Sequence, residues 1–83
     1  MNILVTNIIP TITDFQIKKL FQPFGEINSF QIVPDPHSKH LTSICWIEMK
    51  SDSDGKNAIQ NLDNSLFLGN IIKVVEIQNP VIT

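Results

Sequence analysis

The sequence contains no arginine and no tyrosine, and it has one cysteine and three glycines among its 83 residues. All six cations are lysines, so the chain lacks the guanidinium fork that holds phosphates and guanine edges through two hydrogen bonds at once. The formal net charge is −2, whereas domains held to nucleic acid mainly by phosphate contacts are usually basic. Any nucleic-acid binding must therefore depend less on charge than is usual.

The shortage of sulfur and imidazole ligands limits the covalent and metal chemistry of the chain. Cys45 has no partner for an internal disulfide, and His37 and His40 have no third ligand nearby in the sequence. We expect no metal, no cofactor and a reducing intracellular location, cytoplasmic or, in a eukaryote, nuclear. The apolar runs are short and the N-terminus lacks a basic start, so we expect neither a signal peptide nor a membrane partner.

The length of the chain allows one domain. Hydrophobic residues make up 42% of it, enough for a core. A domain of this size buries only roughly 60 to 65% of the surface of its unfolded chain, so a deep substrate cavity would compete with that core. We therefore expect a surface-binding module and not an enzyme, with a domain over residues 1–77 and a short tail over 78–83.

Hydrophobic periodicity alternates between strand and helix patterns along the chain. Thr13 is placed to cap the first helix, Pro23 to end it, and Ser51 or Ser53 to cap the second. The apolar face of the first helix is expected to comprise Phe15, Ile17, Leu20, Phe21 and Phe24. The pattern predicts strands over 2–7, 27–33, 42–49 and 71–77, and helices over 14–22 and 52–62.

The element order β-α-β-β-α-β predicts an α+β fold of the ferredoxin-like type, with a four-stranded antiparallel sheet and two helices on one face. The other face of the sheet would then be open. Alternation along the strands assigns to this open face Leu4, Thr6, Ser29, Gln31, Val33, Thr42, Ile44, Trp46, Glu48, Ile71, Lys73 and Val75. An exposed face with so much Leu, Ile, Val and Trp usually marks a binding surface.

At this point the sequence resembles the RNA-recognition-motif (RRM) family over about residues 3–77. TITDFQIKKLFQPFGEI is similar to the family's first helix and the following turn, and AIQNLDNSLFLGNIIKV to its second helix and last strand. The family's hexamer on strand one corresponds to ILVTNI, and its octamer on strand three to TSICWIEM.

The resemblance implies a non-catalytic module that lays a short single strand of RNA across its sheet. The three positions where the family usually stacks bases on aromatic rings are Leu4, Ile44 and Trp46 here, so one ring remains. Thr42 stands at the octamer's usual basic position. We therefore expect modest affinity and weak sequence preference. The expected RNA contacts are Leu4, Thr6, Gln31, Lys39, Thr42, Ile44, Trp46 and Lys73.

Other interpretations stay open for several of these features. The apolar sheet would also suit a protein partner or a homodimer, although the family's Arg-x-Phe motif for binding a partner's tryptophan is Ser65, Leu66, Phe67 here. Lys73 could contact RNA or offset Glu48 across the sheet. Acylphosphatase-like hydrolysis, which the same fold supports, is set aside because the sequence has no arginine and no matching loop.

Smaller features are predicted to be structural. Asn7 is expected to fix the turn after the first strand and Gly55 to allow close approach of the second helix. Cys45 is expected to fill the core. The acids at 52 and 54 fit helix capping and the helix dipole better than catalysis.

Overall fold

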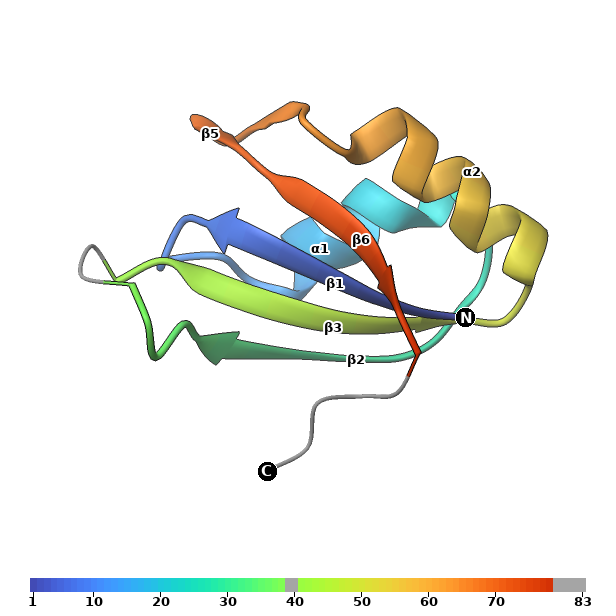
Figure 1. Cartoon of the computed structure of the whole chain (residues 1–83), viewed down its shortest axis with the longest axis horizontal. Coiled ribbons are helices and arrows are strands. Elements are labelled where there is room, and N and C mark those ends of the chain that lie inside the picture. The colour runs from blue at the N-terminus through green and yellow to red at the C-terminus, as the bar shows by residue number, and fades with distance from the viewer. Residues whose placement is uncertain (39–40, 79–83) are drawn as a thin grey trace.

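The protein is described here by a computed structural model that covers residues 1–38 and 41–78 (Figure 1). Six strands, two α-helices and one short 3₁₀ helix follow one another along these residues. In chain order they are β1 (Asn2–Ile8), α1 (Asp14–Phe21), η1 (Gln22–Phe24), β2 (Ile27–Pro34), β3 (Ser43–Met49), α2 (Asp52–Leu62), β4 (Leu66–Phe67), β5 (Asn70–Ile71) and β6 (Lys73–Ile77).

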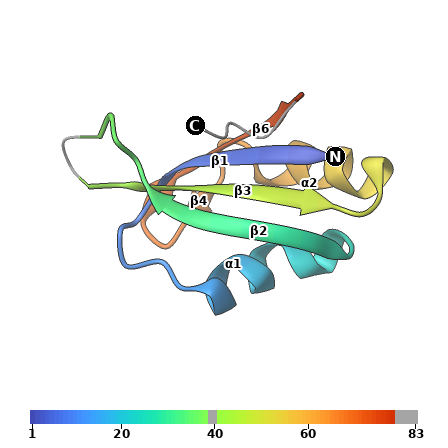
Figure 2. The ribbon, with the colours of Figure 1, turned by 90° about the horizontal axis from the view of Figure 1, so that it is seen from below.

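Four of the strands form one sheet in the order β2-β3-β1-β6, and every neighbouring pair is antiparallel. Figure 2 shows α1 next to β2 and α2 near the start of β1. Side chains that alternate toward the helices are buried, so both helices cover the same face. The predicted ferredoxin-like architecture is therefore confirmed.

The core lies between that face and the helices. Most of its buried members lie in strands and the others mainly in the two helices, and Phe21 supplies the one aromatic ring among them. Its buried members are Ile3, Val5, Ile8, Ile17, Phe21, Cys45, Ile47, Met49, Ala58, Leu62, Ile72 and Val74. The predicted inward side of each strand is confirmed by this set, with Phe30 and Ile32 partly buried against it.

Helix α1 begins where the sequence predicted. The Thr13 hydroxyl accepts a hydrogen bond from the Gln16 amide at 3.2 Å, and the Gln16 side chain accepts one from the Thr13 amide at 3.0 Å. This reciprocal capping box satisfies two amides that the first turn leaves free. The helix ends at Phe21, one residue before the predicted end, and Pro23 continues the chain in η1.

Phe15 is a correction to the predicted apolar face of α1, because 68% of its surface is exposed. It lies in the first turn of the helix, and the Lys19 ammonium is 5.7 Å from the centroid of the Phe15 ring. Ile17 and Phe21, one turn apart, bury the face of the helix that meets the sheet. Phe15 therefore belongs to the solvent side of α1.

Helix α2 has the predicted bounds and is capped by Ser51, whose hydroxyl accepts a hydrogen bond from the Asp54 amide at 3.4 Å. Gly55 is buried in its second turn. A Cβ atom there would stand 3.1 Å from the Met1 Cγ atom and closer still to the sulfur. The close approach at this glycine is thus made against the side chain of Met1, the residue before β1.

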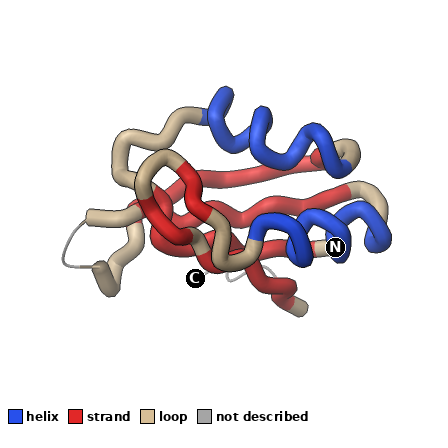
Figure 3. Tube along the Cα trace, turned by 90° about the horizontal axis from the view of Figure 1, so that it is seen from above, coloured by secondary structure: helices blue, strands red, loops and turns tan. Residues whose placement is uncertain are grey.

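The last predicted strand, 71–77, is shorter in the structure because Asn70–Ile71 pairs with Leu66–Phe67 in a two-stranded hairpin. The Ile72 amide and carbonyl also bond to Ser65 and Asn64, so the sheet strand β6 starts only at Lys73. Ile71 therefore lies on the hairpin and not on the open face. Figures 1 and 3 place this hairpin at the end of the molecule away from the N-terminus.

Asn7 ties the hairpin to the end of β1. Its side-chain amide donates to the Ile71 carbonyl at 2.8 Å, and the Asn70 side chain donates to the Asn7 carbonyl at 3.1 Å. Asn7 also has a φ of 65°, a left-handed conformation that asparagine tolerates better than most residues. Asn7 was predicted to fix the turn after the first strand, and it instead lies within β1 and joins that strand to the hairpin.

Three of the remaining boundaries shift by one residue, since β1 ends at 8, β2 at 34 and β3 begins at 43. Of the predicted tail, residues 79–83 lie outside the described part of the chain, and the domain limit at 77 stays a prediction. Neither α-helix within residues 1–38 and 41–78 has the length and apolar character needed to cross a membrane.

Candidate nucleic-acid interface

The register of the sheet aligns one residue from each strand in a row across the middle of the open face. Trp46 on β3 is opposite Gln31 on β2 and Leu4 on β1, and Leu4 is in turn opposite Val75 on β6. We call these four residues the central row. The row places a tryptophan and two aliphatic side chains beside one amide, so its surface is mainly apolar.

Polar groups flank the central row on both sides. Toward the N-terminal end of β1, the carboxylate row comprises Ser29, Glu48, Asn2 and Ile77. On the other side, Val33 is opposite Ile44 and Thr6 is opposite Lys73. We call these four residues the lysine row, and the register between β1 and β3 is irregular there, between Val5 and Ile8. A ligand lying across the central row would therefore meet an acid on one side and a cation on the other.

Trp46 lies on the open face, as predicted, and its side chain is partly exposed. Its Nε1 atom is hidden from solvent, and no acceptor in the described part of the chain bonds to it. The surface that a ligand can reach is therefore the indole ring itself. A partly exposed ring on a central strand is suited to stacking against a planar group.

Leu4 and Ile44 are partly exposed on either side of this ring, and Val75 keeps 42% of its surface exposed. These side chains can make apolar contact with a base but cannot stack as rings do. The structure thus places Leu4, Thr6, Gln31, Ile44, Trp46 and Lys73 together on one face, as the sequence predicted.

Lys73 does not offset Glu48, the alternative considered from the sequence. The two residues belong to the lysine row and the carboxylate row, with the central row between them. The Lys73 ammonium instead donates to the Asn64 side-chain oxygen at 2.6 Å. An ammonium has three protons, so two remain for a ligand.

Thr42 was predicted to begin the third strand, but β3 begins one residue later, at Ser43, and Thr42 lies in the loop between β2 and β3. Its carbonyl accepts from the Asp35 amide at 2.9 Å, and its own amide donates to the Ser38 hydroxyl at 3.2 Å. Thr42 therefore belongs to the base of the loop. Lys39, also a predicted contact, lies outside the described residues, as does His40.

A hollow of about 430 Å³ opens on the sheet face between the carboxylate row and the central row. Its lining comprises Asn2, Ser29, Phe30, Gln31, Trp46, Ile47, Glu48 and Ile77. The sequence did not identify Asn2 or Ile77 as neighbours of Trp46, because cross-strand register is set by long-range pairing. Alternation alone had placed Ser29, Glu48 and Val75 on this face.

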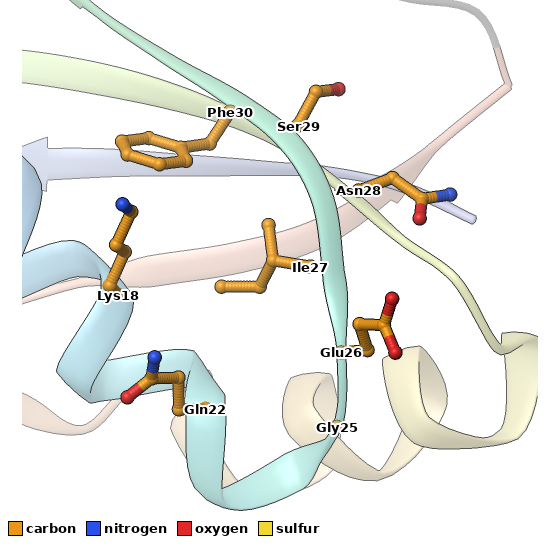
Figure 4. A pocket seen from close by; sticks show the side chains of 8 residues that line it. All are labelled: Lys18, Gln22, Gly25, Glu26, Ile27, Asn28, Ser29 and Phe30. Carbon is orange, nitrogen blue, oxygen red and sulfur yellow. The ribbon is translucent and has the colours of Figure 1, made fainter.

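A second hollow of about 540 Å³ lies at the edge of β2, on the side of α1 (Figure 4). Figure 4 shows the Lys18 side chain directed toward the Phe30 ring, and its nitrogen is 5.7 Å from the ring centroid. Lys18 comes from α1, which covers the opposite face of the sheet from Trp46, and Gln22 comes from η1. This hollow shares Ser29 and Phe30 with the one beside Trp46 but extends toward the helices, away from the central row.

Cys45 points into the core beside Trp46. Burial raises the pKa of its thiol to about 12, against an ordinary value of 9.0. A thiol held neutral is a poor nucleophile and a poor metal ligand. Its predicted role as core filler is confirmed by its complete burial.

The fold and the open apolar face define a class of small α+β modules that bind ligands on an uncovered sheet. Comparison with known proteins narrows the class, because the family model for the RNA recognition motif matches residues 3–73. The chain therefore belongs to the RNA recognition motif family.

Relatives and solved structures agree with this assignment. RbpE of Nostoc sp., a protein named for RNA binding, is 28% identical over 74 residues, which are 89% of this chain and 75% of the relative. The 59 kDa U2AF splicing factor subunit of Schizosaccharomyces pombe is 31% identical over 82% of this chain, but the match spans only 13% of that protein.

Among solved structures, the RNA-binding protein PG1 superposes with a TM-score of 0.83 at 25% identity, over 96% of both chains. The Sxl-lethal protein in its RNA complex superposes with a TM-score of 0.77 at 26% identity, over 89% of this chain and 46% of that one. The chain is thus an RNA-binding type of domain by family and by fold.

Proposed function

We propose that this domain binds a short single strand of RNA across the central row, without catalysing a reaction. The Trp46 ring stacks one base, Leu4 and Ile44 make apolar contact with neighbouring bases, and Lys73 and Lys39 contact the backbone. Thr6, Gln31 and Thr42 contribute hydrogen bonds. The observation that carries the proposal is the alignment of Trp46 with Leu4 at the centre of an open sheet.

The expected affinity is modest. A base stacked on an aromatic side chain contributes about 1 to 3 kcal/mol, and this face offers one such ring. The net charge of −2 adds little long-range attraction for phosphates. Sequence preference should be weak at most positions, because aliphatic contacts discriminate poorly among bases. We expect the domain to act inside the cell, in the cytoplasm or, in a eukaryote, in the nucleus.

Titration of the protein with short single-stranded RNAs at low salt tests the proposal directly. The chain has one tryptophan, so its fluorescence reports on the central row without a label. Trp46→Ala removes this fluorophore, so its binding is measured through backbone amide NMR. The substitution should weaken binding by roughly 5- to 100-fold, because one stacked base is lost. Lys73→Ala should weaken it less. An equal loss in the two variants would argue against stacking.

A protein partner or a second copy of the chain is the other candidate for the same face. The apolar character of the central row and the 42% exposure of Val75 favour it. Sedimentation over a wide concentration range is the test of the homodimer. A mass that rises with concentration and returns to the monomer in Trp46→Glu would support self-association, and a monomer throughout would exclude it.

A further inference from the structure

The carboxylate row contains an acid where a nucleic-acid surface would be expected to avoid one. Glu48 is exposed on the open face and lies two residues after Trp46 on the same strand. Side chains two apart on a strand share a face and stand roughly 7 Å apart. A base stacked on the indole ring therefore has one edge within reach of the Glu48 carboxylate.

The surroundings of Glu48 leave that carboxylate available. Its Oε1 atom accepts one long hydrogen bond from the Ser29 hydroxyl at 3.4 Å. In the described part of the chain no ion pair involves it, and the next lysine along, Lys50, is 3.9 Å from Glu26 instead. The hollow of about 430 Å³ that Glu48 lines with Trp46 gives a base room to enter.

We propose that Glu48 selects a guanine base in this hollow, an inference that rests on the proposed RNA binding and adds a specificity to it. A carboxylate only accepts hydrogen bonds. The Watson–Crick edge of guanine carries two adjacent donors, N1–H and the N2 amino group, which match the two carboxylate oxygens. Single-stranded RNA exposes this edge for such contacts.

The other bases fit the carboxylate less well. Adenine and cytosine each present one amino donor next to a ring acceptor, which the carboxylate repels. Uracil presents one N3–H donor between two carbonyl oxygens. The same negative charge also disfavours RNA phosphates near the carboxylate row, so a strand without guanine gains nothing to offset that repulsion.

The experiment compares the pentamers UUGUU, UUAUU, UUCUU and UUUUU by fluorescence of Trp46 in the full chain. The native protein should bind UUGUU about tenfold more tightly than UUUUU, within the range for a bidentate contact to a base. In UUIUU, inosine lacks the N2 amino group, so one of the two donors is lost. The protein should bind UUIUU only about threefold more tightly than UUUUU.

Glu48→Gln is the decisive variant, with Glu76→Gln as its matched control. Glu76 is an exposed acid on β6, and it is paired with Ile3 of β1, which faces inward. Its replacement therefore changes the net charge by the same amount without altering the open face. Glu48→Gln should reduce the guanine preference to within about twofold and tighten binding of UUUUU, while Glu76→Gln should keep the tenfold preference.

The outcomes separate this inference from the function on which it rests. No binding of any pentamer would overturn both. Binding without a guanine preference, or a preference that survives Glu48→Gln, would overturn the role of Glu48 and leave RNA binding standing. Before titration, thermal unfolding checks that each variant is folded, with a Tm close to that of the native protein.

Discussion

The response of RNA affinity to salt is determined by how many lysines contact phosphates. Each phosphate neutralised on a single strand contributes about −0.7 to the slope of log K against log salt concentration. Two cations are proposed to contact the backbone, Lys73 beside the central row and Lys39, which lies outside the described residues. The expected slope is therefore roughly −1.4, or about a sevenfold loss of affinity between 50 and 200 mM salt.

The other lysines are placed where a strand on the open face cannot reach them together. Lys18 and Lys19 lie on α1 and Lys56 on α2, the helices that cover the opposite face. Lys50 follows β3, and its ammonium is 3.9 Å from the Glu26 carboxylate. Engagement of all six lysines would give a slope near −4.2 and a loss of roughly 300-fold over the same salt range. The two arrangements thus differ by far more than the error of a titration.

The assay is tryptophan fluorescence of the native chain with one pentamer at four or more salt concentrations. Lys73→Ala should reduce the slope to about −0.7, and Lys56→Ala should leave it unchanged. A slope steeper than about −3, or an equal effect of the two substitutions, would refute the placement of RNA on the central row.

Three further measurements test how the framework is held. Thr13→Ala removes the capping box of α1 and should lower the free energy of unfolding by about 1 kcal/mol in urea titration, whereas Thr13→Ser should retain it. Asn7→Ala removes the bond to the Ile71 carbonyl and places alanine at positive φ, so a loss of about 1 to 2 kcal/mol is expected, with Asn7→Gly losing less. Cys45 should resist iodoacetamide at pH 8 in the folded protein and react in urea. Since its folded pKa of about 12 exceeds the ordinary 9.0, its contribution to stability is complete below pH 9 and is lost as pH rises toward 12; a thiol alkylated at equal rates in both states would contradict its burial.

The elements that follow a local rule are the ones that the sequence predicted well. Thr13 and Ser51 cap helices through bonds to amides three residues ahead, and α2 has its predicted bounds. Strand alternation likewise assigned Trp46 outward and Cys45 inward without knowledge of the partners. Each of these depends on residues close together in the chain.

The errors concern contacts between distant segments. Ile71 has the composition of a sheet residue, but pairing with Leu66 places it on a hairpin. Phe15 is as apolar as a core residue, but it lies on the solvent side of α1, whereas Ile17 and Phe21 are buried. The neighbours of Trp46 in the hollow include Asn2 and Ile77. They are brought there because β1 pairs with β3 and with β6, strands that are distant in the sequence.

The lack of arginine and the presence of Glu48 have a common consequence for recognition. A face rich in cations binds every strand through its phosphates, and differences among bases then form a small part of the total free energy. Here the proposed backbone contacts are few, and an acid adjoins the stacking ring. Any affinity that remains must come largely from the bases. A single edge contact at Glu48 can therefore decide which strands bind, even in a domain that we propose holds RNA weakly.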